Sequence, residues 1–275
     1  MIQPMNLWRM SIGTAGLVLA GCAAVAPVDD LTWSSPLAKS LPLEEGAVIE
    51  AARFSKLRPN GSDLGEWQQF EIVRGNKPTN YHLVERDGVV VIQAESSEGG
   101  SGLFRKIRID PHRNPIIEWR WRVPSDSGRG GQDGPSAESP PVRLSLAFDG
   151  DAATLDFDDR AKLRMAKALT PHGLPFASLL YVWQNRDPVD TLYSSPHTER
   201  VRHIVVASGE RQLDQWVSVR RNVLEDYRRA FGEEPGDIVA VGIMTDYGDN
   251  GAPRRAFYGD IRFRSESDGH ASSGK

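Results

Sequence analysis

Apolar and polar residues alternate along much of this 275-residue chain, which is the pattern expected of β-strands with one buried face. Segment 116–123 shows it most clearly, because every second residue is apolar: Ile117, Trp119, Trp121 and Val123. Segment 142–149 repeats the pattern with its own apolar set: Val142, Leu144, Leu146 and Phe148. We expect both sets to face the interior of a β-structure.

Further segments of the same kind follow one another at close spacing. With the two above, the predicted strands are 47–54, 67–73, 81–85, 89–95, 103–109, 116–123, 142–149, 179–184, 201–207, 215–223, 238–245 and 256–263. Residues 86–88, Arg-Asp-Gly, separate two of these strands and predict a hairpin turn, because glycine accepts a positive φ. Helical periodicity appears at 158–169 and 225–231.

Many strands with so few helices exclude a doubly wound α/β fold, which needs a helix between successive parallel strands. The pattern instead predicts a mainly β protein, an antiparallel β-sandwich of jelly-roll-like type with two small helical inserts. We place this domain at residues 47–266. A loop rich in Gly, Pro, Ser and Asp, 124–141, interrupts it, and loops of this length are often functional.

The chain begins with a pattern typical of export. Arg9 precedes an apolar run, 10–20, which is shorter than the roughly 20 residues of a membrane-spanning helix and suits a signal peptide. The run ends in Leu-Ala-Gly-Cys, which is similar to the lipobox of bacterial lipoproteins. Residues 1–21 are therefore predicted to be a lipoprotein signal peptide, and Cys22 is predicted to carry the palmitate-type lipid anchor.

The ends of the mature chain are expected to have little structure. Residues 22–46, which follow from the lipidated cysteine, are predicted to be a flexible tether, and residues 267–275 a disordered tail. Ala23 after the cysteine favours the outer membrane, with the domain in the periplasm. The protein would be anchored to the cell envelope through lipid.

Composition changes this picture little. The chain is 39% hydrophobic and 25% charged, which is ordinary for a globular domain. Its net charge of −4 is spread along the chain without a basic block, so nucleic acid is not an expected partner. Cys22 is the single cysteine, so the domain must be held together by its core and not by disulfides.

Several short motifs resemble the bacterial domain of unknown function 3047 family in order and spacing. They are Trp119-Arg-Trp121, the loop leading to Arg143, Tyr181-Val-Trp183, Trp216, Gly242-Ile-Met-Thr-Asp246 and Tyr258-Gly-Asp-Ile261. That family has no established activity, so the resemblance implies no catalytic residue. This chain has Asp-Tyr-Gly-Asp-Asn at 246–250, where the family has an Asp-x-Asp-Asn run. The last motif is also similar to the closing strand of jelly-roll carbohydrate-binding modules.

One acidic, glycine-rich stretch is a candidate metal site. Asp246, Asp249, Asn250 and Asp260 offer the hard oxygen ligands that a structural calcium prefers. The spacing is not that of an EF-hand, and the same residue types are those that tight turns require. A polar turn therefore remains the alternative, and no other cofactor is expected.

A second candidate site lies at the end of one predicted strand. Tyr181 and Trp183 share a strand face, and they lead into the polar residues Asn185, Arg186 and Asp187. Aromatic faces stack on sugar rings and polar groups bond the hydroxyls, so this mixture favours a carbohydrate ligand. Burial in the sandwich core is the alternative for the two rings, as it is for Trp119 and Trp121.

Catalysis has weaker support, since no nucleophile, phosphate-binding or metal motif appears. A polysaccharide hydrolase or lyase would need converging carboxylates, for which Asp133, Glu138 and Asp149 are the candidates. A structural lipoprotein of an envelope complex is the third possibility. The favoured hypothesis is a non-catalytic, envelope-associated binding module for carbohydrate or another envelope component, with envelope proteins as alternative partners.

Overall fold

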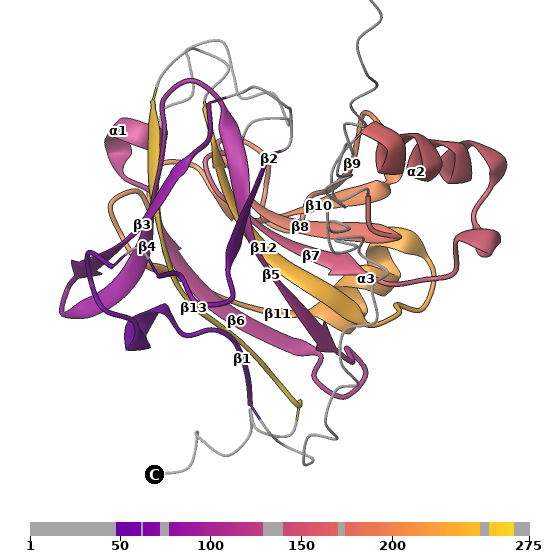
Figure 1. Ribbon diagram of the computed structural model, residues 1–275, viewed down its shortest axis with the longest axis horizontal. Coiled ribbons are helices and arrows are strands. Elements are labelled where there is room, and N and C mark those ends of the chain that lie inside the picture. The colour runs from indigo at the N-terminus through magenta and orange to yellow at the C-terminus, as the bar shows by residue number, and fades with distance from the viewer. Residues whose placement is uncertain are drawn as a thin grey trace, which may run out of the picture. The chain divides into compact units, whose positions relative to one another are not determined.

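Two β-sheets stacked face to face form the body of the protein in the computed structural model (Figure 1). The structure describes residues 48–61, 63–71, 77–128, 140–169, 174–247 and 253–266. The predicted signal peptide, Cys22, the whole of the tether and the predicted tail lie outside these ranges. The prediction of a β-sandwich is confirmed.

The first sheet, here sheet A, has the order β11-β6-β13-β4-β3, and β1 also pairs with β13. Its strands are β1 (Ile49–Ala52), β3 (Asn80–Arg86), β4 (Val89–Ser96), β6 (Ile116–Arg122), β11 (Val217–Asn222) and β13 (Arg254–Arg264). The second, sheet B, has the order β2-β5-β12-β7-β8-β10-β9. Its strands are β2 (Gln68–Glu71), β5 (Gly100–Ile109), β7 (Arg143–Phe148), β8 (Ala177–Gln184), β9 (Leu192–Ser195), β10 (Thr198–Ser208) and β12 (Ile238–Asp246).

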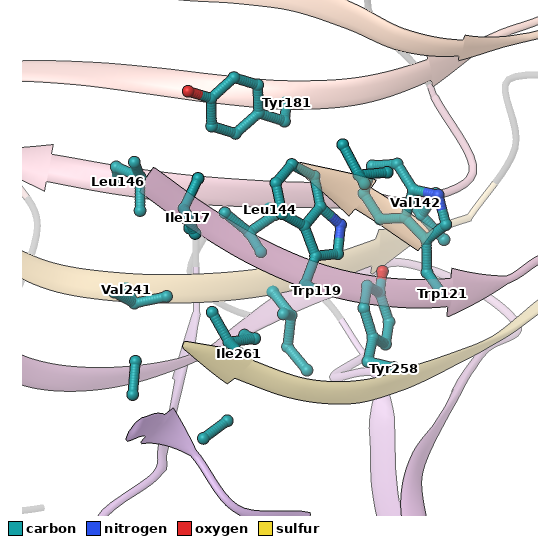
Figure 2. Packing of buried hydrophobic residues seen from close by; sticks show 14 of the residues in the cluster. Ile117, Trp119, Trp121, Val142, Leu144, Leu146, Tyr181, Val241, Tyr258 and Ile261 are labelled. Carbon is teal, nitrogen blue, oxygen red and sulfur yellow. The ribbon is translucent and has the colours of Figure 1, made fainter. Parts of the chain in front are cut away.

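The core lies between the sheets and consists of the apolar sets that the alternation predicts. Trp119 and Trp121 of β6 are buried, with their ring centroids 5.4 Å apart. Leu144 and Leu146 of β7 face them from sheet B and are fully buried (Figure 2). The two predicted faces are therefore both confirmed.

The hairpin between β3 and β4 also forms as predicted. Arg86 pairs with Val89, so the loop consists of Asp87 and Gly88. Their φ values are +53° and +75°, as in the turns whose twist matches that of paired strands.

Two details of sheet B differ from the prediction. β9 has no counterpart among the predicted strands, because all four of its residues are partly buried and so show no alternation. β10 pairs with β8 in parallel, whereas every other pair is antiparallel in the part of the chain described. Alternation reports burial and not strand direction, so it could not reveal this pairing.

Helices are few. Both predicted helices form, as α2 (Phe157–Leu169) and α3 (Val223–Phe231). The structure also has a one-turn helix, α1 (Ser125–Gly128), and two 3₁₀ turns, η1 (Phe54–Lys56) and η2 (Ala152–Thr154). α3 begins where the Asn222 side chain accepts a hydrogen bond from the Glu225 N–H, and it ends at Gly232, whose φ is +71°. Among the described residues, no helix is both long and apolar enough to cross a membrane.

Candidate functional site

β8 carries the rings that were predicted to stack on a ligand, but both point inward. Tyr181 and Trp183 are fully buried (Figure 2 shows Tyr181). The Tyr181 ring lies 5.2 Å from that of Trp119, and its hydroxyl donates to Asp226 at 2.9 Å. The indole N–H of Trp183 donates to the Gly209 carbonyl at 3.1 Å. The predicted ligand contact of these two rings is wrong, because their face of β8 is the core face.

The opposite face of β8 belongs to a polar cluster on the outside of sheet B. Strand register brings its members together from five neighbouring strands: Arg143 of β7, Gln184 of β8, Tyr193 of β9, His203 of β10 and Asp246 of β12. We call these five residues the sheet B cluster. Among the polar clusters of the described residues, this one lies closest to the ligand site predicted at the end of β8.

An ion pair lies at the centre of the sheet B cluster. The Arg143 guanidinium donates to Asp246 Oδ2, and the Arg143 residue is only 5% exposed. Beside this pair, Gln184 Nε2 donates to the Tyr193 hydroxyl at 2.8 Å. The rings of Tyr193 and His203 stack in parallel, with centroids 4.7 Å apart and planes 3° apart. The cluster thus combines one charged pair with an amide and two stacked rings.

The electrostatics of the cluster keep its histidine neutral. Burial, together with the nearby charge of Arg143, lowers the pKa of His203 to about 4. Burial also raises the pKa of the Tyr193 phenol, so that ring is neutral as well. At neutral pH His203 has one nitrogen that donates and one that accepts a hydrogen bond.

Two buried atoms of the cluster have no hydrogen-bond partner among the described residues, Asp246 Oδ1 and His203 Nδ1. More than nine in ten buried polar groups in proteins are bonded, so such atoms need an explanation. Asp246 Oδ1 has room because residue 100 is glycine, since a Cβ at that position would lie only 2.8 Å from this oxygen. These atoms have unused capacity to bond a ligand.

The predicted polar loop adjoins this cluster. Asn185, Arg186 and Asp187 follow β8 directly, and Arg186 is exposed. The charge of Asp187 raises the pKa of Tyr193, which places its carboxylate within electrostatic range of the cluster. The predicted loop therefore lies beside the sheet B cluster, whereas the two predicted rings lie on the opposite face of β8.

A separate groove lies on the outside of sheet A. It has a volume of about 540 Å³, and its lining includes three acids and three arginines from four strands: Glu50, Glu118, Arg120, Arg220, Asp260 and Arg262. Glu118 is the common partner of three arginines, Arg220, Arg262 and Arg264. This surface was not singled out from the sequence.

The predicted calcium site is not assembled as proposed. Asp246 pairs with Arg143 on the outside of sheet B, whereas Asp260 accepts from the Ser55 N–H at 2.9 Å and lines the groove on sheet A. The core separates these two aspartates, since packed sheets stand about 10 Å apart, so they cannot share one ion. Asp249 and Asn250 lie outside the described residues. No group of three potential metal ligands occurs within the described ranges.

Of the candidate catalytic acids, Asp149 can be placed. It lies just past the far end of β7 from Arg143, roughly 20 Å along the strand, and it pairs with Arg108, which also binds Asp237. Asp133 and Glu138 lie outside the described residues. Asp149 is therefore remote from the sheet B cluster.

Comparison with known families identifies the chain. A family profile described as protein of unknown function, DUF3047, matches residues 65–262. The chain belongs to the DUF3047 family. The predicted resemblance is thereby confirmed. No curated protein matches this DUF3047 chain.

Solved structures give distant matches to this DUF3047 protein. The family 11 carbohydrate-binding module of cellulase Lic26A-Cel5E of Clostridium thermocellum has 10% identity, covers 80% of this chain and 96% of its own, and has a TM-score of 0.37. The xyloglucanase domain of NopAA from Sinorhizobium fredii has 9% identity, coverages of 74% and 100%, and a TM-score of 0.39. The family GH12 endoglucanase 3 of Trichoderma harzianum has 7% identity, coverages of 81% and 95%, and a TM-score of 0.39. At these values the similarity says nothing of ligand or activity.

The sequence contained a signal for some of the residues that were missed. In the DUF3047 chain, Arg143 lies between the apolar residues Val142 and Leu144, and Gln184 follows the apolar run 179–183, whereas His203 adjoins Arg202 and had no such signal. A single polar residue within an apolar run is the kind of buried polar group that informs about function. Tyr193 had no such signal, because its strand was not predicted.

Proposed function

We propose that this DUF3047 protein is a non-catalytic binding module that holds a carbohydrate on the sheet B cluster. The observation that carries the proposal is a pair of buried atoms on either side of Arg143, Asp246 Oδ1 and His203 Nδ1, which find no hydrogen-bond partner in the described part of the chain. A buried ion pair is weak evidence for stability, so its position on a solvent-side sheet face favours a role in recognition.

Sugar hydroxyls suit these groups because each hydroxyl both donates and accepts hydrogen bonds. The Asp246 carboxylate accepts hydrogen bonds and the Arg143 guanidinium donates them. The neutral His203 donates from one ring nitrogen and accepts at the other. The partly exposed Tyr193 adds an aromatic ring, the surface on which the apolar face of a pyranose packs. The loop 185–187 would form the rim beside it.

The number of carboxylates in the sheet B cluster favours binding of a carbohydrate over its hydrolysis. Glycosidases place two carboxylates about 5 to 10 Å apart. Within the described residues the cluster has one, Asp246, and it is held by Arg143. An acid so paired is poorly suited to give up or accept a proton.

The compartment is part of the same proposal. With Cys22 lipidated after export, the module would be anchored in the outer membrane and would meet glycans of the cell envelope. That anchoring rests on the signal-peptide pattern alone. Detection of an acylated N-terminal Cys22 by mass spectrometry of the purified protein would test it.

Calorimetric titration with glycans tests the binding site. The full chain in detergent would be titrated with oligosaccharides from cellulose, xylan, mannan and peptidoglycan. We expect Asp246→Asn and Tyr193→Ala each to weaken binding of the recognised oligosaccharide about tenfold or more, since each removes a direct contact. Asp149→Asn, which alters an acid remote from the cluster, is the matched control. Unchanged binding by both folded cluster variants would refute the site.

A further inference from the structure

The outside of sheet A carries an excess of arginine that the proposed function does not use. Outward positions of β6, β11 and β13 hold six arginines beside the acids Glu118 and Asp260, namely Arg120, Arg122, Arg220, Arg255, Arg262 and Arg264. The chain as a whole has a net charge of −4, so the charge of this face is opposite in sign to that of the whole protein. The groove on this face is lined by three arginines and three acids, so binding of an anion there depends on arginine donors that the acids leave unused.

Glu118 organises part of this face into a row. In the strand register Arg220 of β11 and Arg262 of β13 both stand opposite Glu118 of β6, and Glu50 of β1 stands on the other side of Arg262. Neighbouring strands are about 4.8 Å apart, so the two arginines flank the carboxylate at a backbone separation of roughly 10 Å. The row runs across the strands and along the floor of the groove.

The two flanking arginines have unused donors. Arg220 approaches Glu118 through Nε at 3.4 Å, and Arg262 donates to it through Nε at 3.1 Å. The terminal nitrogens of both make no hydrogen bond to the described part of the chain, and both side chains are 51% exposed. A guanidinium has five N–H donors in a planar fork that matches a carboxylate.

Arg120 lines the groove and contacts a tryptophan ring. The guanidinium carbon of Arg120 lies 4.7 Å from the centre of the Trp216 ring, whose Nε1–H donates to Asp87 at 2.8 Å. Arg120 also crosses Gly259, where a Cβ would come within 2.7 Å of Arg120 Cγ. The side chain is thus held in place between the ring and a backbone position that has no side chain of its own.

We propose that this groove is a second binding site, which takes an acidic polysaccharide through its carboxylate groups. The volume of about 540 Å³ falls in the range of about 300 to 1,000 Å³ that is usual for ligand sites. The spare forks of Arg220 and Arg262 would each bind one carboxylate. Glu118 holds both forks in position in the free protein and repels ligand groups that come too close to it, so it sets the spacing of the acids that fit.

Calorimetric titration of the full chain in detergent with polygalacturonate oligomers tests the site, and galactan oligomers of equal length serve as the neutral comparison. We expect binding of the acidic oligomer alone, weakening as salt rises. The double variant Arg220→Gln/Arg262→Gln should weaken it at least tenfold. Arg113→Gln is the matched control, because Arg113 is 74% exposed and pairs with Asp110 outside this groove.

A second variant tests the groove without removing any of its arginines, so that a loss of binding is not caused by loss of an ion pair that supports the fold. Ser218→Glu adds a carboxylate at an exposed groove position without removing an existing ion pair, and it too should weaken polygalacturonate binding. The double variant should still bind the neutral oligosaccharide that the sheet B cluster recognises, which separates the groove from that cluster. The proposal is overturned if polygalacturonate does not bind, or if Arg113→Gln weakens it equally. It is also overturned if the double variant loses only adsorption to phosphatidylglycerol vesicles, which would assign the face to a membrane surface.

Discussion

The two outer faces of the sandwich hold arginine in different surroundings. On sheet A, Arg220 stands half in solvent beside Glu118, whereas on sheet B, Arg143 is 5% exposed and paired with Asp246. Exposed ion pairs contribute about 0 to 1 kcal/mol, while breaking a buried pair costs about 3 to 5 kcal/mol. The difference teaches that the sheet A groove can be altered with little effect on folding, but the sheet B cluster cannot.

The largest expected effect comes from breaking the buried pair. Asp246→Ala removes the carboxylate that pairs with Arg143, and we expect the free energy of unfolding to fall by about 3 to 5 kcal/mol in urea denaturation. The double variant Arg143→Met/Asp246→Leu should recover most of this loss, because it removes both charges. A double variant as unstable as the single one would contradict this account of the pair.

A smaller effect is expected from the titration of His203. Its folded pKa of about 4 lies below the unfolded value of about 6.5, so between these values the unfolded chain binds a proton that the folded chain does not. Stability should therefore rise with pH from 4 to 6.5, and His203 contributes up to about 3 kcal/mol of that rise.

His203→Phe keeps an aromatic ring against Tyr193 and removes the titrating group. Unfolding measured at several pH values should show a flatter profile for this variant than for the wild type. His112→Gln is the control, because that side chain is 46% exposed. An identical pH profile for wild type and His203→Phe would show that His203 titrates normally.

The smallest expected effect on stability comes from a substitution on the outside of sheet A. Arg220→Gln should change the free energy of unfolding by less than about 1 kcal/mol, because the side chain is 51% exposed and its pair is screened by solvent. Urea denaturation beside Asp246→Ala gives the direct comparison of the two faces. A loss as large as that of Asp246→Ala would mean that Glu118 and its arginines hold the fold together.

Strands were predictable from the sequence because burial imposes a period of two. Segment 116–123 has that period and became β6, whereas β9 has every residue partly buried and left no pattern. The parallel pairing of β10 with β8 was equally invisible, since side-chain alternation is the same in both directions.

The candidate site was only partly predictable. Alternation places Tyr181 and Trp183 on one face of β8 but does not say that this face is the core. The ion pair joins Arg143 to Asp246, which are 103 residues apart, and only the pairing of β7 with β12 brings them together. Their partnership depends on topology, which local pattern does not encode.

The position of β9 at the edge of sheet B has a further consequence. This strand of four residues is hydrogen-bonded to β10 alone in the described sheet, yet it carries Tyr193, which stacks on His203. Short edge elements separate from a fold at a lower free energy than its core does. Transient fraying of β9 would uncover the His203 imidazole while the sandwich stays closed, so a ligand that holds Tyr193 in place would slow amide hydrogen exchange along this strand.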